Sequence, residues 1–159
     1  MALEIERKFV VKIDGPAVLK QADKSIPIIQ AYLKVTDDEE LRIRKKGPKY
    51  IVTSKQGKGL VRKEEEREVT AAEGKKLLAS APKQFQVIKK VRFEFGRWEL
   101  DVFQTPRLPA GIGIAEIELK SKTEKMPPVP KGITIIKEVT EDKRFKNKNI
   151  AKTKRFPSP

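Results

Sequence analysis

The 159-residue chain contains neither cysteine nor histidine. Without cysteine it has no disulfides and no thiol chemistry. Without histidine it lacks the commonest general base and the usual zinc ligand. Any bound metal must therefore be held by carboxylates and backbone oxygens, a donor set that favours Mg²⁺ or Mn²⁺.

Long apolar runs are missing as well. No segment approaches the roughly 20 apolar residues that a membrane-spanning helix needs. The first eight residues lack the apolar stretch of a signal peptide. We therefore expect a soluble cytoplasmic protein without a membrane partner. Its length suits one domain over residues 1–159, with a frayed tail from about residue 152.

Negative charge is scarce relative to positive charge. The sequence has 36 Lys and Arg against 22 Asp and Glu, which gives a formal net charge of +14. Such an excess indicates a polyanionic partner: nucleic acid, an acidic membrane or a small phosphate-rich ligand. The sequence gives no indication of the oligomeric state.

What the sequence does contain is alternation with a period of two residues, which is typical of strands with one apolar and one charged face. Strands are predicted around residues 4–9, 41–44, 51–55, 90–95, 98–102 and 115–120. Helices are fewer. Thr70 and Glu73 form a capping box that opens one helix, and shorter helices are predicted over residues 16–22 and 141–151. These elements favour one antiparallel α+β domain.

Like charges recur at alternate positions of these strands, roughly 6.8 Å apart on one face. The sets are Glu4/Glu6, Arg42/Arg44, Glu64/Glu66/Glu68, Lys90/Arg92, Glu99/Asp101 and Glu116/Glu118. Each strand taken alone also fits an ordinary sheet with its charges in water. Because adjacent like charges disfavour folding, we interpret the whole set as facing ligands of opposite charge. Carboxylate pairs would bind a divalent cation, and basic pairs would bind phosphate.

Closing the sheet with its charged faces inward would bring these pairs together. The apolar faces would then point outward and need covering helices. Such an arrangement makes sense if the lumen holds water and a charged ligand. The pattern therefore predicts an antiparallel β-barrel with a charged lumen and a few helices outside it.

The motifs resemble, in order, those of the CYTH or triphosphate tunnel metalloenzyme family. Residues 4–8, Glu-Ile-Glu-Arg-Lys, are similar to its ExExK signature. Similar segments follow at residues 31–33, 41–44, 53–55, 62–68, 90–92, 98–101, 115–119 and 138–140, so the resemblance covers residues 3 to about 151. It implies an eight-stranded antiparallel tunnel and metal-dependent hydrolysis of a triphosphate. The family includes thiamine triphosphatases, inorganic tripolyphosphatases and a class of adenylate cyclases.

The resemblance also implies roles for individual residues. Those expected to bind phosphate are Lys8, Arg42, Arg44, Lys55, Arg62, Lys90 and Arg92. The primary metal ligands are expected to be Glu4, Glu6, Glu116 and Glu118, with Asp101, Glu66 and Glu68 as secondary candidates. The catalytic signature comprises Glu4, Glu6 and Lys8. Water would attack a terminal phosphorus in line, with Mg²⁺ or Mn²⁺ as the cofactor.

Other segments have less definite roles. Glu64 and Glu99 are expected to be structural, and Trp98 and Tyr32 to pack in the interior. The lysine-rich stretch 143–155 is either a solvated helix face or, as the resemblance allows, a closure of one tunnel end with Arg144 near the ligand.

The favoured substrate is inorganic tripolyphosphate, because no motif for an organic leaving group is evident. An adenylate cyclase or a thiamine triphosphatase of the same family is the first alternative. A non-catalytic module that binds polyphosphate or nucleic acid is the second, suggested by the +14 charge. The acidic pairs argue against nucleic acid, because they would repel its phosphate backbone.

Overall fold

A single curved sheet dominates the computed structural model, which describes residues 5–57 and 63–157. Its strands are β1 (Ile5–Ile13), β2 (Lys24–Val35), β3 (Glu39–Lys46), β4 (Lys49–Gln56), β5 (Lys63–Val69), β6 (Ile88–Phe95), β7 (Trp98–Thr105), β8 (Ile112–Leu119) and β9 (Ile133–Glu138). The helices are α1 (Pro16–Leu19), α2 (Ala71–Ala79) and α3 (Asn147–Thr153), with a 3₁₀ turn, η1 (Lys143–Phe145). None of the described helices is long and apolar enough to cross a membrane.

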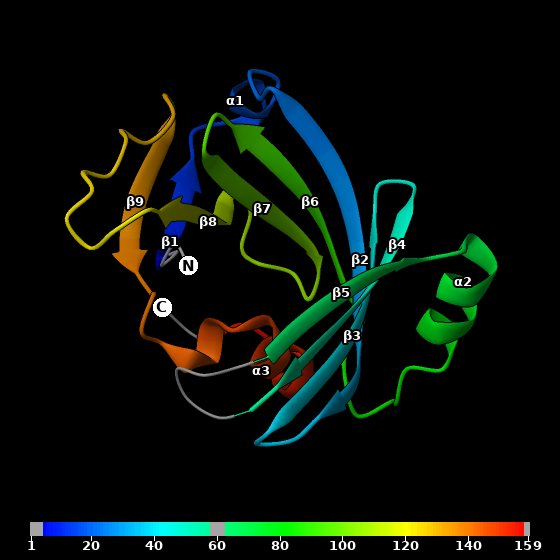
Figure 1. The fold of residues 1–159 in the computed structure, drawn as a ribbon. Helices are drawn as coiled ribbons and strands as arrows, with labels where there is room; N and C mark the ends of the chain where they lie inside the picture. Colours follow the sequence, from blue (N-terminus) through cyan, green and yellow to red (C-terminus); the bar gives the residue numbers. More distant parts are fainter. Residues whose placement is uncertain (1–4, 58–62, 158–159) are drawn as a thin grey trace.

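All strand pairings are antiparallel, in the order β5-β4-β3-β2-β6-β7-β8-β1-β9. The expected antiparallel sheet with few helices is therefore confirmed. The described sheet differs from the expected eight-stranded closed barrel, because it has nine strands and is open between its end strands, β5 and β9. The sheet curls strongly, so that β3 to β5 lie across a central space from β1, β8 and β9 (Figure 1).

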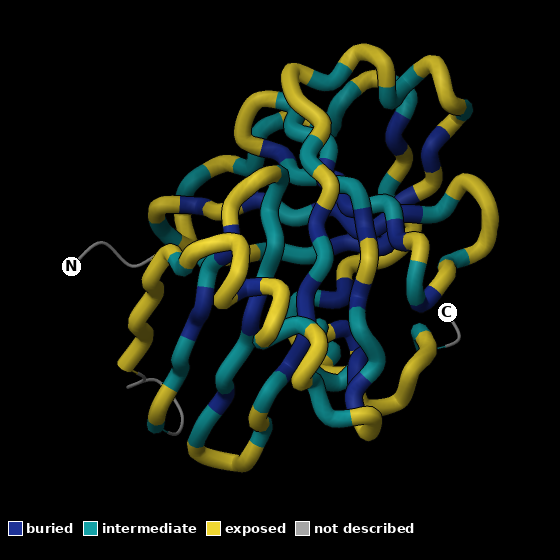
Figure 2. The backbone as a smooth tube through the Cα atoms, turned by 90° about the vertical axis from the view of Figure 1, so that its right-hand side faces the viewer, coloured by how far each residue is buried: buried dark blue, intermediate teal, exposed yellow. Residues whose placement is uncertain are grey.

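The outer, convex face of the sheet carries two apolar clusters. Ala31, Ile43, Tyr50 and Val52 lie under α2, which packs Leu77 and Leu78 against them. On the other half of the sheet, the cluster centred on Phe9 and Trp98 is covered by α1 and by the proline-rich loop before β9. Trp98 Nε1 donates to the Pro128 carbonyl over 3.0 Å and so holds that loop in place. Figure 2 shows the buried positions gathered in the middle of these strands, and both faces are buried where strands such as β1 and β8 have consecutive buried residues.

A third apolar cluster fills one end of the concave face. Phe145, Ile150 and Ala151, from η1 and α3, pack there against side chains of β1, β2, β6, β7 and β8. The concave face of β1, β6, β7 and β8 is charged towards one end and apolar towards the other. On β1, for example, Glu6 and Lys8 precede the buried Val10. The C-terminal helix thereby closes the apolar end and leaves the charged end open.

The C-terminal segment departs from the sequence prediction in two ways. A helix over 141–151 capped by Thr140 is wrong, because the Thr140 hydroxyl bonds the Glu138 carboxylate instead. The Asp142 side chain accepts from the Arg144 amide and starts the separate turn η1, and α3 follows. The tail expected to fray from residue 152 is helical to Thr153, and beyond it the Phe156 ring packs edge-on against Phe103 at 4.7 Å.

Near the other end of the chain, the helix expected over 16–22 ends at Leu19. The helix opened by Thr70 is confirmed as α2, with the Thr70 hydroxyl accepting from the Glu73 amide over 3.1 Å. Strands β2 and β9 were not predicted from alternation. The sequence of β9 lacks clear alternation and follows a proline-rich stretch.

Gly74 lets α2 lie directly on β4. A Cβ atom at this position would overlap the Tyr50 ring and its Cβ. We therefore expect Gly74→Ala to lower the free energy of unfolding by about 1–2 kcal/mol, because the cost of overpacking exceeds the gain of roughly 1 kcal/mol in helix propensity. Denaturant unfolding measures the change. Lys75→Ala, on the exposed side of α2, is the control and should change stability by less than about 0.5 kcal/mol. A Gly74→Ala protein as stable as wild type would contradict this close packing.

Candidate active site

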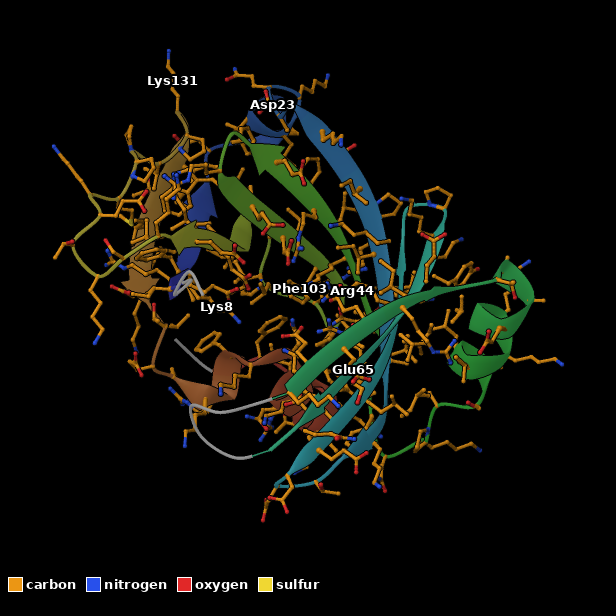
Figure 3. The ribbon with its side chains drawn as sticks, viewed as in Figure 1. Lys8, Asp23, Arg44, Glu65, Phe103 and Lys131 are labelled. Atoms are coloured by element: carbon orange, nitrogen blue, oxygen red, sulfur yellow. The ribbon has the colours of Figure 1, made fainter. Side chains whose placement is uncertain are left out.

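The charged end of the concave face forms a pocket of about 390 Å³. It is lined by Glu6, Lys8, Tyr32, Glu40, Arg42, Arg44, Lys55, Glu64, Arg92, Glu99, Glu116, Glu118, Lys146, Asn147 and Lys148. Lys8 and Arg44, on opposite halves of the sheet, lie on either side of the central space (Figure 3). Side chains separated by more than 100 residues in sequence thus share one pocket.

One wall of the pocket is acidic. Glu6, Glu99, Glu116 and Glu118 come from the adjacent strands β1, β7 and β8. Glu116 lies opposite both Lys8 on β1 and Glu99 on β7, and Glu118 lies opposite Glu6. Burial raises the pKa of Glu6, and the negative charge of Glu116 raises it further. Such mutual repulsion is what a bound cation would relieve.

The facing wall is mainly basic. Arg42 and Arg44 lie on β3 and Lys55 lies on β4. Burial, together with the positive charge of Arg42, lowers the pKa of Arg44 to about 10. The buried Nε of Arg42 has no hydrogen-bond partner among the described residues. Because an unsatisfied buried donor is costly, an anionic ligand that accepted from this nitrogen would be favoured.

Ion pairs link the two charge types inside the pocket. Lys8 Nζ lies 3.3 Å from Glu116 Oε1, and Arg92 Nη1 lies 2.9 Å from Glu99 Oε2. Among the described residues, the lining comprises seven basic and six acidic side chains, so their formal charge is only +1. The pocket is therefore suited to a ligand that brings both charge types, such as an anion with its metal cation.

Lys90 and Asp101 differ from the sequence prediction, because they lie beneath the pocket and do not line it. Lys90 is 1% exposed and Asp101 is 2% exposed. Lys90 Nζ is 2.7 Å from Asp101 Oδ2, while Arg92 donates to both Asp101 oxygens at 2.8 and 3.0 Å. Since its oxygens are occupied in this way, Asp101 is not placed to ligate a metal in the pocket, and Lys90 is not placed to contact phosphate there.

The pKa values in this buried group reflect the pairing of one carboxylate, that of Asp101, with two cations, Lys90 and Arg92. Although burial opposes ionisation, Lys90 and Arg92 hold the pKa of Asp101 well below its usual range. Burial lowers the pKa of Lys90 to about 8, against the opposing effect of Asp101. Asp101 therefore fixes the orientation of Arg92, whose Nη1 reaches the pocket wall at Glu99.

Strand β5 contributes one glutamate to the pocket lining among the described residues. Glu64, opposite Lys55, lines the pocket, whereas it was expected to be structural. Glu66 and Glu68, the secondary metal candidates, do not line it. Glu66 accepts a long bond of 3.5 Å from Thr53, and exposed Glu68 lies 4.0 Å from Lys49. Two other predicted site residues, Glu4 and Arg62, lie outside the described residues.

Sequence reasoning missed several lining residues. Glu40, Glu99 and Lys148 carry charges that line the pocket, and Lys148 Nζ lies 3.0 Å from Glu40 Oε1. Within the lysine-rich stretch, Lys146 and Lys148 take the position that the resemblance suggested for Arg144. Arg144 instead pairs with Asp142 at 2.7 Å and is exposed. The two-residue spacing of Glu99 from Asp101 was the available signal for Glu99.

A profile of the CYTH domain matches residues 2–153, almost the whole chain. The chain belongs to the CYTH domain family. A curated inorganic triphosphatase of Nitrosomonas europaea is 34% identical over 155 residues, spanning 93% of this chain and 96% of its own.

Solved structures agree with this CYTH assignment. A crystal structure of the inorganic triphosphatase NE1496 has a TM-score of 0.65 at 30% identity, with 96% of both chains covered. The PH1012 protein of Pyrococcus horikoshii, at 23% identity over 76% of this chain and 80% of its own, has a TM-score of 0.50 and shares the fold alone.

The acidic wall of this CYTH domain fits a divalent metal by the chemistry of its donors. Four carboxylates on neighbouring strands offer the hard oxygen ligands that such cations prefer. In the described part of the chain, no three acidic residues are already drawn together into a ligand cluster. Glu116 pairs instead with Lys8 and Glu99 with Arg92, so metal binding would exchange these pairs for a cation.

Proposed function

We propose that the protein hydrolyses inorganic tripolyphosphate in this pocket with Mg²⁺ or Mn²⁺ as the cofactor. The observation that carries the proposal is the division of one 390 Å³ pocket into an acidic and a basic wall. A metal–triphosphate complex has the same division of charge. The similarity to the Nitrosomonas europaea inorganic triphosphatase supports the same reaction class.

In this proposal, the basic residues of the pocket bind the substrate and the acidic residues bind the metal. Arg42, Arg44, Lys55 and Arg92 would bind phosphate oxygens, the arginines through their planar forks. Glu6, Glu116 and Glu118, together with Glu4, would hold the metal. When bound, it would neutralise phosphate charge and acidify the attacking water.

Lys8 would join the two groups, since it pairs with Glu116 at the acidic wall and its ammonium can reach a phosphate oxygen there. Fixing the substrate in line with water accounts for most of the expected rate gain. We also propose that the ends of the curled sheet close around the substrate, which would give the closed tunnel that the family resemblance implies.

The lining favours an inorganic substrate over a nucleotide or thiamine triphosphate. Tyr32 is its only aromatic residue among those described, and Tyr32 is buried against the Phe85 ring at 6.5 Å. No aromatic face is therefore offered to an adenine or a thiazolium ring. We place the whole activity in a single domain.

One assay tests this proposal against its alternatives. Purified protein is incubated with tripolyphosphate, ATP or thiamine triphosphate, each with Mg²⁺, Mn²⁺ or EDTA, and phosphate, pyrophosphate and cyclic AMP are measured. We expect phosphate release from tripolyphosphate, faster than from either organic substrate, and its loss in EDTA. Cyclic AMP as the main product would replace the proposal with a cyclase. Metal-independent binding without turnover would replace it with a binding module.

A further inference from the structure

The catalytic pocket does not account for the strong positive charge of the protein. The described lining residues contribute a formal charge of +1, whereas the whole chain of 159 residues carries +14. The excess of lysine and arginine therefore lies elsewhere in the molecule. A charge excess on an outer surface needs a separate physical explanation, because it disfavours the compact state through self-repulsion.

A second cavity, of about 640 Å³, lies on another side of α3. We call it the C-terminal groove, and it is lined by Lys143, Arg144, Asn149, Lys152, Thr153, Arg155, Phe156 and Pro157. Four of these eight residues are basic, and none of those lining it is acidic. Helix α3 thus separates a nearly neutral pocket from a strongly basic groove.

Local contacts hold the groove in shape. Asn149 Nδ2 donates to the Lys143 carbonyl over 2.7 Å and ties α3 to η1. Beyond the helix, Lys154 Nζ donates to the Lys83 carbonyl over 3.0 Å, and the Phe156 ring rests against Phe103. The floor is therefore fixed by packing, with part of the Phe156 ring exposed in the groove.

The charges of the groove are available to a ligand. Asp142 pairs with Arg144. For Lys143, Lys152 and Arg155, no carboxylate lies within 4.0 Å in residues 5–57 and 63–157. All three of these side chains are exposed. A ligand with several negative charges would gain from meeting them together.

We propose that the C-terminal groove binds single-stranded nucleic acid. Its basic rim matches a phosphate backbone, while Phe156 and Pro157 give an apolar surface on which a base can stack. A polyphosphate chain could bind the basic residues of the rim, but it has no apolar or aromatic group to pack on Phe156 and Pro157. Among the described residues, none of the acidic pairs that argue against nucleic acid in the sequence lines this groove.

The test measures binding of a fluorescent 20-nucleotide oligouridylate by anisotropy at several salt concentrations. We expect Lys152→Gln/Arg155→Gln to weaken binding at least tenfold at low salt. Loss of two phosphate contacts should also reduce the slope of log affinity against log salt by about 1.4. Lys75→Gln/Lys76→Gln, on α2, removes the same charge from another surface and should leave binding unchanged. Equal losses in both variants would overturn the proposal in favour of diffuse attraction.

A separate variant tests the contribution of the Phe156 ring to binding. Phe156→Leu keeps an apolar side chain against Phe103 and should weaken oligouridylate binding about fivefold through loss of stacking. Binding of long-chain polyphosphate should not change. If polyphosphate binds more tightly than oligouridylate and Phe156→Leu has no effect on either, the groove binds polyphosphate and the proposal is wrong.

Two activity measurements separate this inference from the proposed triphosphatase. Lys152→Gln/Arg155→Gln should retain phosphate release from tripolyphosphate, because neither residue lines the catalytic pocket. Arg42→Ala should weaken that activity, through a KM raised about 10- to 100-fold, and retain oligouridylate binding. Loss of both functions in either variant would show that the two sites are one, and so would contradict a separate groove.

Discussion

Replacing Asp101 with asparagine is expected to lower the free energy of unfolding by about 3–5 kcal/mol. The substitution keeps the shape of the side chain and removes the carboxylate that neutralises Lys90 and Arg92. Both cations are almost fully buried, so water cannot replace the lost partner. Without Asp101 the pKa of Lys90 should fall further below about 8, since Asp101 opposes the effect of burial. Denaturant unfolding measures the loss.

A surface ion pair provides the comparison for Asp101→Asn. Glu39→Gln breaks the exposed pair with Lys34, 2.9 Å apart, and should change stability by less than about 1 kcal/mol. Arg92 keeps its ion pair with Glu99, whereas Lys90 is left without a carboxylate partner, so adding Lys90→Met to Asp101→Asn should recover part of the loss. Stability close to wild type in the single Asp101→Asn protein would contradict the counter-ion role.

Much of the candidate site follows from alternation alone. Successive side chains of a strand point to opposite faces, so two charges spaced by two residues share one face and the apolar residues beside them occupy the other. Predicted residues that do line the pocket are Glu6, Lys8, Arg42, Arg44, Lys55, Arg92, Glu116 and Glu118. Their convergence required only that the charged faces of separate strands meet on one concave surface.

Alternation shows which face of a strand a residue occupies. It does not show how close that residue lies to the apolar end of the concave face. Asp101 shares a face with Glu99, and Lys90 shares one with Arg92, yet both lie one step nearer the apolar cluster of Phe103 and Ile88. That boundary is set by η1 and α3, which are more than 40 residues away in the sequence. The distinction between a ligand-binding charge and a buried supporting charge therefore depends on long-range packing.

The predicted number of strands, eight, was wrong for a related reason, since the described sheet has nine. A prediction from alternation needs one face that is clearly apolar, and in β9 Ile135 is followed directly by Ile136, an exposed residue. Strand β5 is charged at six consecutive positions, so its facing could not be read from the sequence. It is fixed instead by pairing with β4, which places Glu64 opposite Lys55.

Glu116→Gln is expected to have the largest effect on catalysis, reducing kcat by at least about 100-fold. Glu116 lies between Lys8 and Glu99 on the acidic wall, so its carboxylate is central to the proposed metal site. Arg42→Ala should act differently, because it removes a phosphate-binding group and should raise KM about 10- to 100-fold. Steady-state phosphate release from tripolyphosphate, measured over a range of Mn²⁺ concentrations, separates the two effects.

The dependence on metal is the decisive part of that experiment. If Glu116 holds the cation, raising Mn²⁺ should partly restore turnover in Glu116→Gln and should not lower KM in Arg42→Ala. Glu65→Gln, an exposed glutamate paired with Lys63 at 3.1 Å, is the matched control and should behave as wild type. Because Gln and Glu have the same shape, circular dichroism should be unchanged in both glutamine variants. Wild-type turnover in Glu116→Gln would mean that the metal binds elsewhere, and the acidic wall would lose its proposed role.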